Sequence, residues 1–304
     1  MTPISPPAML PIVNHARELL ENYFAADPSS IGSETPAKAY QLLTASLTYA
    51  LDQPAFAQAI IDHQHELVAF SRDLMIFFAG MRAVGGRAPA PAPSRPQSPT
   101  EGGPGAGYRS SSLARQAGER DGFCCFSGVP QEPLDPHIGA HIIPFAISRL
   151  DGDLGINFQK MLACYSPDTV INSTDIDPVN NVITLIQPAH AAFGRFMWVV
   201  DVDKWTVDCL KKSLATTWWV KATRASIQDA PFLCKKNGPL APNADYLRLH
   251  ASLGKVLWMS GRAEELVGDD EDPETFPEAV REPIQRVMET MAAEDWRIEV
   301  AEVI

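Results

Sequence analysis

The chain has 304 residues and a mass of 33.2 kDa, enough for one large domain or two small domains with a sizeable hydrophobic core. Hydrophobic residues make up 45% and charged residues 20%, which is typical of globular proteins and excludes disorder along the whole chain. The net charge of −12 is unevenly distributed, because residues 105–260 carry 15 basic and 14 acidic side chains whereas residues 261–304 carry 4 and 14. A polyanionic ligand is therefore compatible with the middle of the chain.

The sequence indicates neither a secreted protein nor a membrane protein. Five cysteines are an odd number in a chain of this length, which argues against a disulfide framework and for a reducing compartment. The N-terminal residues lack the basic region and the apolar run of a secretion signal. The most apolar stretch, residues 67–81, contains Arg72 and Asp73 and is too short to span a bilayer. We therefore predict an intracellular protein, nuclear or cytoplasmic, with no membrane partner.

The first part of the chain, residues 1–84, is predicted to be a helical region. Its apolar residues recur at spacings of three, four and seven, as in Leu67, Phe70, Leu74, Phe77 and Met81. Residues 85–112 are rich in proline, glycine and serine and nearly free of large apolar groups. Such a segment cannot bury enough surface to offset its ordering entropy, so it is predicted to be a disordered linker.

The next segment, residues 113–260, is predicted to mix strands and helices, which gives an α+β fold class. A helix is expected over residues 246–261, ended by Gly261, and a hairpin turn at 201–204. Residues 261–304 form an acidic tail with a predicted terminal helix. Short β-like runs separated by turn residues are found at residues 123–126, 137–143, 181–186, 196–202, 205–210 and 217–222.

Two histidines in the middle segment occupy positions that suit a shared site. The β-branched run that contains His141 stops at Pro144, so His141 is expected near a strand end, where its side chain can reach a cleft. Pro188 suits the first turn of a helix, which places His190 in that turn. Two strands and a helix would then bring the two imidazoles together.

Three stretches in this order resemble the HNH endonuclease family. They are the Arg-Asp-x-x-Cys-Cys-x-Ser-Gly run 120–128, the Ala-His-Ile-Ile-Pro run 140–144, and Asn181 with a histidine nine residues later. The resemblance covers residues 113–197 and is closest to a branch common among fungal proteins, whose first histidine follows a small residue. It implies a ββα-metal finger, here elaborated with extra β-structure and helices into an HNH domain over residues 113–260, beside the N-terminal helical region.

The resemblance also implies hydrolysis of phosphodiester bonds, of DNA by expectation, with a divalent metal such as Mg²⁺, Mn²⁺ or Zn²⁺. By resemblance, His141 is the general base, His190 is a metal ligand, and Asn181 pins the loop that orients His141. Two positions where many HNH nucleases carry ligands are occupied here by Ala140 and Gly194. An alternative is that both histidines ligate the metal while another side chain or water acts as base. Candidates for additional ligands near the motif are Asp135, His137, Asp175 and Asp177.

Two further interpretations stay open beside the nuclease. The Ala140 and Gly194 pair favours a catalytically degenerate HNH-fold binding or scaffold protein. The acidic overall charge favours a repurposed enzyme that uses the histidine pair on a small molecule. If nucleic acid is the partner, the basic pairs of the middle segment are candidates for phosphate contacts: Lys211 and Lys212, and Lys235 and Lys236.

The cysteines are not expected to bind metal. Cys124 and Cys125 are adjacent, and no Cys-x-x-Cys pair occurs anywhere in the chain. All five thiols are therefore interpreted as small apolar groups that pack in the core.

Overall fold

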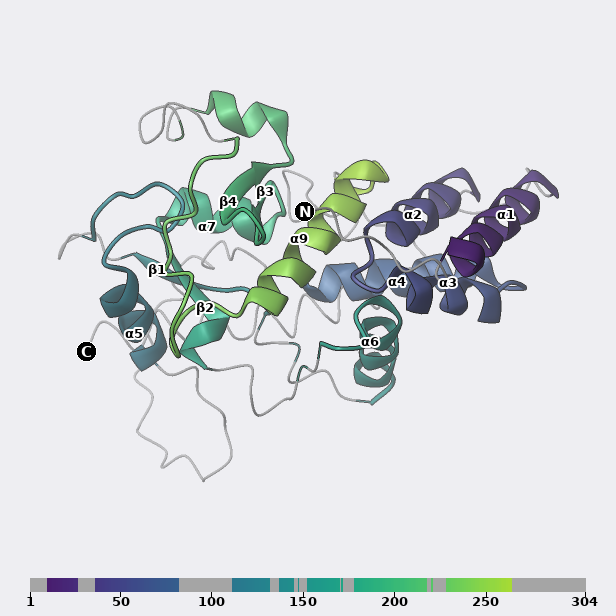
Figure 1. Ribbon diagram of the computed structural model, residues 1–304, viewed down its shortest axis with the longest axis horizontal. Helices are drawn as coiled ribbons and strands as arrows, with labels where there is room; N and C mark the ends of the chain where they lie inside the picture. The colour runs from purple at the N-terminus through teal and green to yellow at the C-terminus, as the bar shows by residue number, and fades with distance from the viewer. Residues whose placement is uncertain are drawn as a thin grey trace, which may run out of the picture.

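The computed structural model has an α+β architecture with two small antiparallel sheets, as the sequence predicts (Figure 1). No helix among the described residues is long and apolar enough to cross a membrane. The structure describes residues 10–26, 36–81, 111–131, 137–144, 147, 152–169, 171, 178–217, 220 and 228–263.

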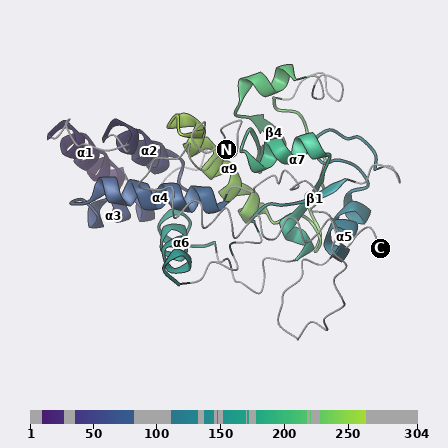
Figure 2. The ribbon, with the colours of Figure 1, turned by 180° about the vertical axis from the view of Figure 1, so that it is seen from behind.

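Four helices of the N-terminal region lie together at one side of the molecule (Figures 1 and 2). The third begins where the Asp52 side chain accepts a hydrogen bond from the Ala55 amide at 2.9 Å, with Pro54 in the first turn. In the fourth, the predicted periodic residues from Leu67 to Met81 are buried. The helices are α1 (Leu10–Ala26), α2 (Pro36–Tyr49), α3 (Gln53–Asp62) and α4 (Leu67–Met81).

Helices on either side of the predicted linker share one hydrophobic core. The ring of Phe77 in α4 lies 4.9 Å from that of Phe158 in α6 (Gly152–Tyr165). The Asp52 amide donates to the carbonyl of Tyr165 at 3.4 Å. Most of the predicted linker lies outside the described residues, and α5 (Ser111–Asp121) begins within its last two positions. The proposed domain limits stay a prediction, whereas the packing joins the N-terminal helices to the rest.

Among the described residues, the β-structure consists of two two-stranded antiparallel sheets. Strand β1 (Ile138–His141) pairs antiparallel with β2 (Val182–Leu185), and helix α7 (Gln187–Gly194) follows β2. Strand β3 (Trp198–Asp201) pairs antiparallel with β4 (Thr206–Cys209). The turn between β3 and β4 confirms the prediction for residues 201–204, and the Lys204 amide donates to Asp201 Oδ1 at 3.1 Å.

The predicted strand at 123–126 was wrong, because these residues enter a turn. The Gly128 amide donates to the Cys124 carbonyl at 2.8 Å, and Gly128 has φ of +75°, which favours glycine. The β-like run at 217–222 and the predicted terminal helix of the acidic tail lie mostly or wholly outside the described residues.

Helix α9 (Ala244–Met259) joins the helical and β parts of the molecule (Figure 1). It confirms the helix predicted over residues 246–261: Asn243 caps its start, and Gly261 follows its end with φ of +71°. The helix packs on α2 and on β3. A Cβ at Gly254 would lie 3.0 Å from side-chain carbons of Val199 and Leu210, so a larger residue here requires these neighbours to shift.

The imidazole of His250 is buried in the middle of this junction. Its side chain stacks on Phe193 with ring centroids 3.9 Å apart, and its Nε2 lies 3.2 Å from the Phe193 carbonyl oxygen. Because burial disfavours the charged ring more than the carbonyl favours it, the pKa of His250 falls to about 3.

This depressed pKa predicts that acid destabilises the fold through His250. The pKa lies below the ordinary value of about 6.5, so the stabilisation is complete above pH ~6.5 and is lost as pH falls toward 3. Between those limits the expected loss is about 1.4 kcal/mol per pH unit. Urea unfolding at pH 7 and pH 5 should show a clearly smaller pH dependence for His250→Gln than for wild type. The exposed His65→Gln variant should show the same pH dependence as wild type. If the unfolding free energy of His250→Gln falls between pH 7 and pH 5 as much as that of wild type, His250 is not the group responsible.

Candidate active site

His141 occupies the strand end that the sequence predicts. It is the last residue of β1 and pairs with Val182, the first residue of β2. Its side chain is half-buried, while its neighbour Ala140 is fully buried. The imidazole is therefore only partly exposed, and its Nε2 is among the buried side-chain atoms.

Asn181 clamps the chain that leaves His141. Its side-chain Oδ1 accepts a hydrogen bond from the Ile143 amide at 2.9 Å, and its Nδ2 donates to the Ile143 carbonyl at 2.9 Å. Its own carbonyl accepts from the Ile142 amide at 2.8 Å. Since Asn181 is fully buried, water does not compete for these bonds. The amide thus fixes the backbone two residues beyond His141.

His190 lies in the first turn of α7. The helix starts after Ile186 with Pro188 in its first turn, and the His190 amide donates to the Ile186 carbonyl at 2.9 Å. The Trp198 indole donates to the Ala189 carbonyl at 3.1 Å and so anchors this turn to β3. The His190 side chain is half-buried, and α7 packs against β1, the strand that carries His141.

The described residues do not complete a metal site around the two histidines. No group of three His, Cys, Asp or Glu donors among them includes His141 or His190. A divalent ion binds well only with several donors. Of the predicted additional ligands, His137 is buried directly before β1. The other three, Asp135, Asp175 and Asp177, lie outside the described residues.

The lysine pairs lie on segments other than β1, β2 and α7. Lys211 is half-buried with its Nζ 6.0 Å from the Trp258 ring, and Lys212 is exposed. Lys235 and Lys236 are exposed in the segment before α9, and the Lys236 Nζ lies 5.7 Å from the Trp205 ring. Their role in phosphate binding stays a prediction.

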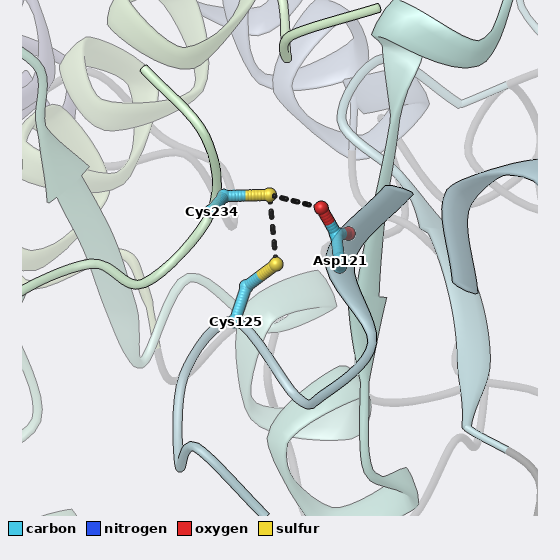
Figure 3. Close-up of side chains that lie close together, drawn as sticks. All are labelled: Asp121, Cys125 and Cys234. Carbon is cyan, nitrogen blue, oxygen red and sulfur yellow. Dashed lines mark hydrogen bonds between the residues drawn. The ribbon is translucent and has the colours of Figure 1, made fainter. Parts of the chain in front are cut away.

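A buried cluster that the sequence analysis missed joins Asp121, Cys125 and Cys234 (Figure 3). The two Sγ atoms are 2.7 Å apart, and the Cys234 Sγ is 3.1 Å from Asp121 Oδ1. The three side chains offer ligand atoms that all lie within 4.8 Å of one another, so they form a candidate metal group. The local sequence carries no signal for it, because Cys234 is 109 residues from Cys125.

A buried ion pair supports this cluster and the start of β2. The Arg120 guanidinium contacts both carboxylate oxygens of Asp121, at 2.7 and 2.6 Å. It also donates to the carbonyls of Val179, Val182 and Leu240 at 2.8–3.0 Å. Burial acts to raise the pKa of Asp121, but the hydrogen bonds and charge of Arg120 outweigh burial and hold that pKa below its ordinary value.

Cys124 ties the turn at 124–128 to the helix of His190. Its Sγ accepts hydrogen bonds from the amides of Ser127 and Ile186, both at 3.4 Å. The neighbouring Cys125 amide donates to the Thr184 carbonyl of β2 at 2.8 Å. The turn therefore contacts both β2, through the Thr184 carbonyl, and the residue before α7, through the Ile186 amide.

The ion pair predicts a large stability loss when only its acid is neutralised. Asp121→Asn leaves the Arg120 cation buried without a carboxylate, and we expect the free energy of unfolding to fall by about 3–5 kcal/mol. Glu119→Gln on the same helix removes the exposed partner of Arg115 and should change it by less than about 0.5 kcal/mol. Urea unfolding at neutral pH measures both, and equal values for the two variants would contradict this account.

The Asn181 clamp gives a second stability prediction. Asn181→Ala leaves the buried amide and carbonyl of Ile143 without side-chain partners, at an expected cost of about 2–4 kcal/mol in unfolding free energy. Asn180→Ala is the matched control, because the Asn180 side-chain oxygen accepts no hydrogen bond. If Asn181→Ala and Asn180→Ala have the same melting temperature or the same urea midpoint, the clamp contributes nothing to stability.

A family model matches part of the chain. Residues 124–201 match the family model described as HNH endonuclease, over about a quarter of the chain. No match was found among curated proteins or among solved structures. The fungal branch stays a prediction. The segment that holds β1, β2 and α7, and with them His141, Asn181 and His190, is thus similar to HNH endonucleases.

Proposed function

We propose that this protein is a metal-dependent nuclease of the HNH type that hydrolyses phosphodiester bonds of DNA. The observation that carries the proposal is the clamped strand end: His141 closes β1, and the buried amide of Asn181 fixes the chain beyond it. This arrangement lies within the segment that matches HNH endonucleases.

In the proposed reaction, His141 is the general base. An imidazole suits this role because its ordinary pKa lets it take up and return a proton near neutral pH. It removes a proton from the water that attacks phosphorus, while the bond to the 3′ oxygen of the preceding sugar breaks. The strand end holds the ring half-buried, with its Nε2 among the buried side-chain atoms, so in this proposal the attacking water approaches from the part of the ring that stays exposed.

Asn181 acts in this proposal as a positioning residue. It does not touch the substrate but holds the backbone that leaves His141 at two points. A base works only within hydrogen-bond reach of its proton, so a loosened strand end reduces the rate even when the fold persists.

His190 is the proposed ligand of a divalent ion such as Mg²⁺, Mn²⁺ or Zn²⁺. An imidazole nitrogen is a suitable donor, and His137, Asp135, Asp175 and Asp177 are the proposed sources of further donors. When bound, such an ion supplies positive charge that stabilises the phosphate as negative charge develops on it.

The charge distribution favours a short DNA contact. Residues 105–260 are close to neutral, with 15 basic and 14 acidic side chains, so few phosphates can be neutralised. Lys211, Lys212, Lys235 and Lys236 are the proposed phosphate contacts. Binding should therefore be measured at low salt.

Plasmid nicking tests the proposal. With Mg²⁺, Mn²⁺ or Zn²⁺ added, wild type should nick supercoiled plasmid, and His141→Ala should be slower by ~10²–10⁴-fold because the base is lost. His65→Ala, on the exposed surface between α3 and α4, is the matched control and should keep the wild-type rate. Nicking that is unchanged in His141→Ala, or absent from wild type with every metal, would refute the nuclease.

A second candidate is a catalytically degenerate HNH-fold binding protein. It is favoured by Ala140 and Gly194, which place no donor beside the histidines, and by the lack of a three-donor group with either histidine among the described residues. A melting temperature that no metal raises, together with metal-independent binding of a labelled oligonucleotide, supports this candidate. A metal-dependent rise without nicking supports the repurposed small-molecule enzyme instead.

A further inference from the structure

Cys125 and Cys234 are held closer together than an ordinary pair of buried thiols. Their Sγ atoms are 2.7 Å apart. Nonbonded heavy atoms normally rest ~3.5–4.0 Å apart, whereas the sulfurs of a disulfide are ~2.0 Å apart. The observed separation lies between the two values, so a small movement of either side chain is enough to bond the sulfurs.

Hydrogen bonds to the carbonyls of both cysteines hold their two chain segments side by side. The Leu233 amide donates to the Cys125 carbonyl at 3.0 Å, and the Trp205 indole donates to the Cys234 carbonyl at 2.8 Å. These bonds fix the segment of Cys234 beside the turn of Cys125. Neither cysteine takes part in the proposed hydrolysis.

The spacing and the charge of the cluster argue against a metal ion there. Two thiolates on a tetrahedral zinc with Zn–S bonds of ~2.3 Å lie about 3.8 Å apart, well beyond the separation seen here. The Arg120 guanidinium already occupies both oxygens of Asp121, and its Nη2 lies 3.5 Å from the Cys234 Sγ. A dication would have to displace this cation from its carboxylate.

We propose that Cys125 and Cys234 are a reversible redox pair that closes into a disulfide on exchange with a low-molecular-weight disulfide. The pair stands independently of the proposed nuclease activity, because it rests on contacts that involve neither His141 nor His190.

Cys234 is the sulfur that reacts first. It lies in a segment whose neighbours Leu233 and Lys235 are exposed, so a local opening of that segment admits the oxidant. Burial, followed by the hydrogen bond with Cys234, raises the pKa of the Cys125 thiol well above its ordinary value, so Cys125 acts second.

The disulfide forms by two successive thiol–disulfide exchange reactions. The Cys234 sulfur attacks one sulfur of the oxidant, whose S–S bond breaks, giving a mixed disulfide and one released thiolate. Cys125 then attacks the Cys234 sulfur, forms the internal disulfide and expels the second thiolate. The two protons of the cysteines end on the two released thiols, so the cysteines lose two electrons and the oxidant gains two.

A disulfide between Cys125 and Cys234 would covalently link two distant parts of the chain beside the Arg120–Asp121 ion pair. The cysteines are 109 residues apart, and a link across so long a loop constrains the unfolded chain strongly. We expect the melting temperature of the oxidised protein to exceed that of the reduced protein by about 5–10 °C.

The test equilibrates the full chain with reduced or oxidised glutathione, denatures it, alkylates free thiols and maps the peptides by mass spectrometry. All five cysteines should be alkylated after reduction, and oxidation should leave three alkylated, with one cross-link between Cys125 and Cys234. Five alkylated cysteines after oxidation, or a cross-link between other cysteines, would overturn the proposal.

Variants and a metal assay complete the test. Cys125→Ser and Cys234→Ser should lose the cross-link and the rise in melting temperature, whereas Cys209→Ser, outside the cluster, should keep both. Stoichiometric zinc in the purified wild type, lost in Cys234→Ser, together with absence of the cross-link, would overturn the redox pair in favour of a zinc site. If either serine variant fails to fold, the wild-type peptide map decides alone.

Discussion

The buried pair of Arg120 and Asp121 is the interaction on which the candidate active site depends. Through its remaining donors, the guanidinium holds the carbonyls of Val179 and Val182, which flank Asn181 on both sides. These bonds fix the backbone at the start of β2. Because Val182 pairs with His141, they also fix the end of β1. A charge that is buried this deeply is tolerable only because the carboxylate and the carbonyls satisfy it together. The position of the general-base candidate is therefore set by an ion pair outside the reacting groups.

The β1–β2 sheet and α7 then place the two histidines relative to this fixed start of β2. The amide of Asn181 supplies the backbone bonds that a strand lacks at its end, so His141 can close β1 without a frayed backbone beyond it. The sulfur of Cys124 does the same for the Ile186 amide at the start of α7. The end of β1 and the start of α7 are thus both supported by side chains, and the two histidines that they carry are half-buried.

The N-terminal helices contribute to this architecture through α9. That helix packs on α2 on one side and on β3 on the other, and its His250 stacks on Phe193 of α7. A neutral imidazole in this contact couples the stability of the helical part to the helix that carries His190. The shared core also explains why the proline-rich segment does not divide the molecule into two independent halves, since the surfaces it connects bury each other.

The sequence alone determined the local elements of this protein: the amphipathic α4, α9 with its end at Gly261, the turn at residues 201–204, and the placement of His141 at a strand end and His190 in a first helical turn. These follow from periodicity, proline and glycine, which act over a few residues. Only the tertiary structure decided that residues 123–126 form a turn and that Cys234 meets Cys125. A contact across 109 residues depends on how α9 and the preceding segment pack, and such packing leaves no trace in the spacing of residues along the chain.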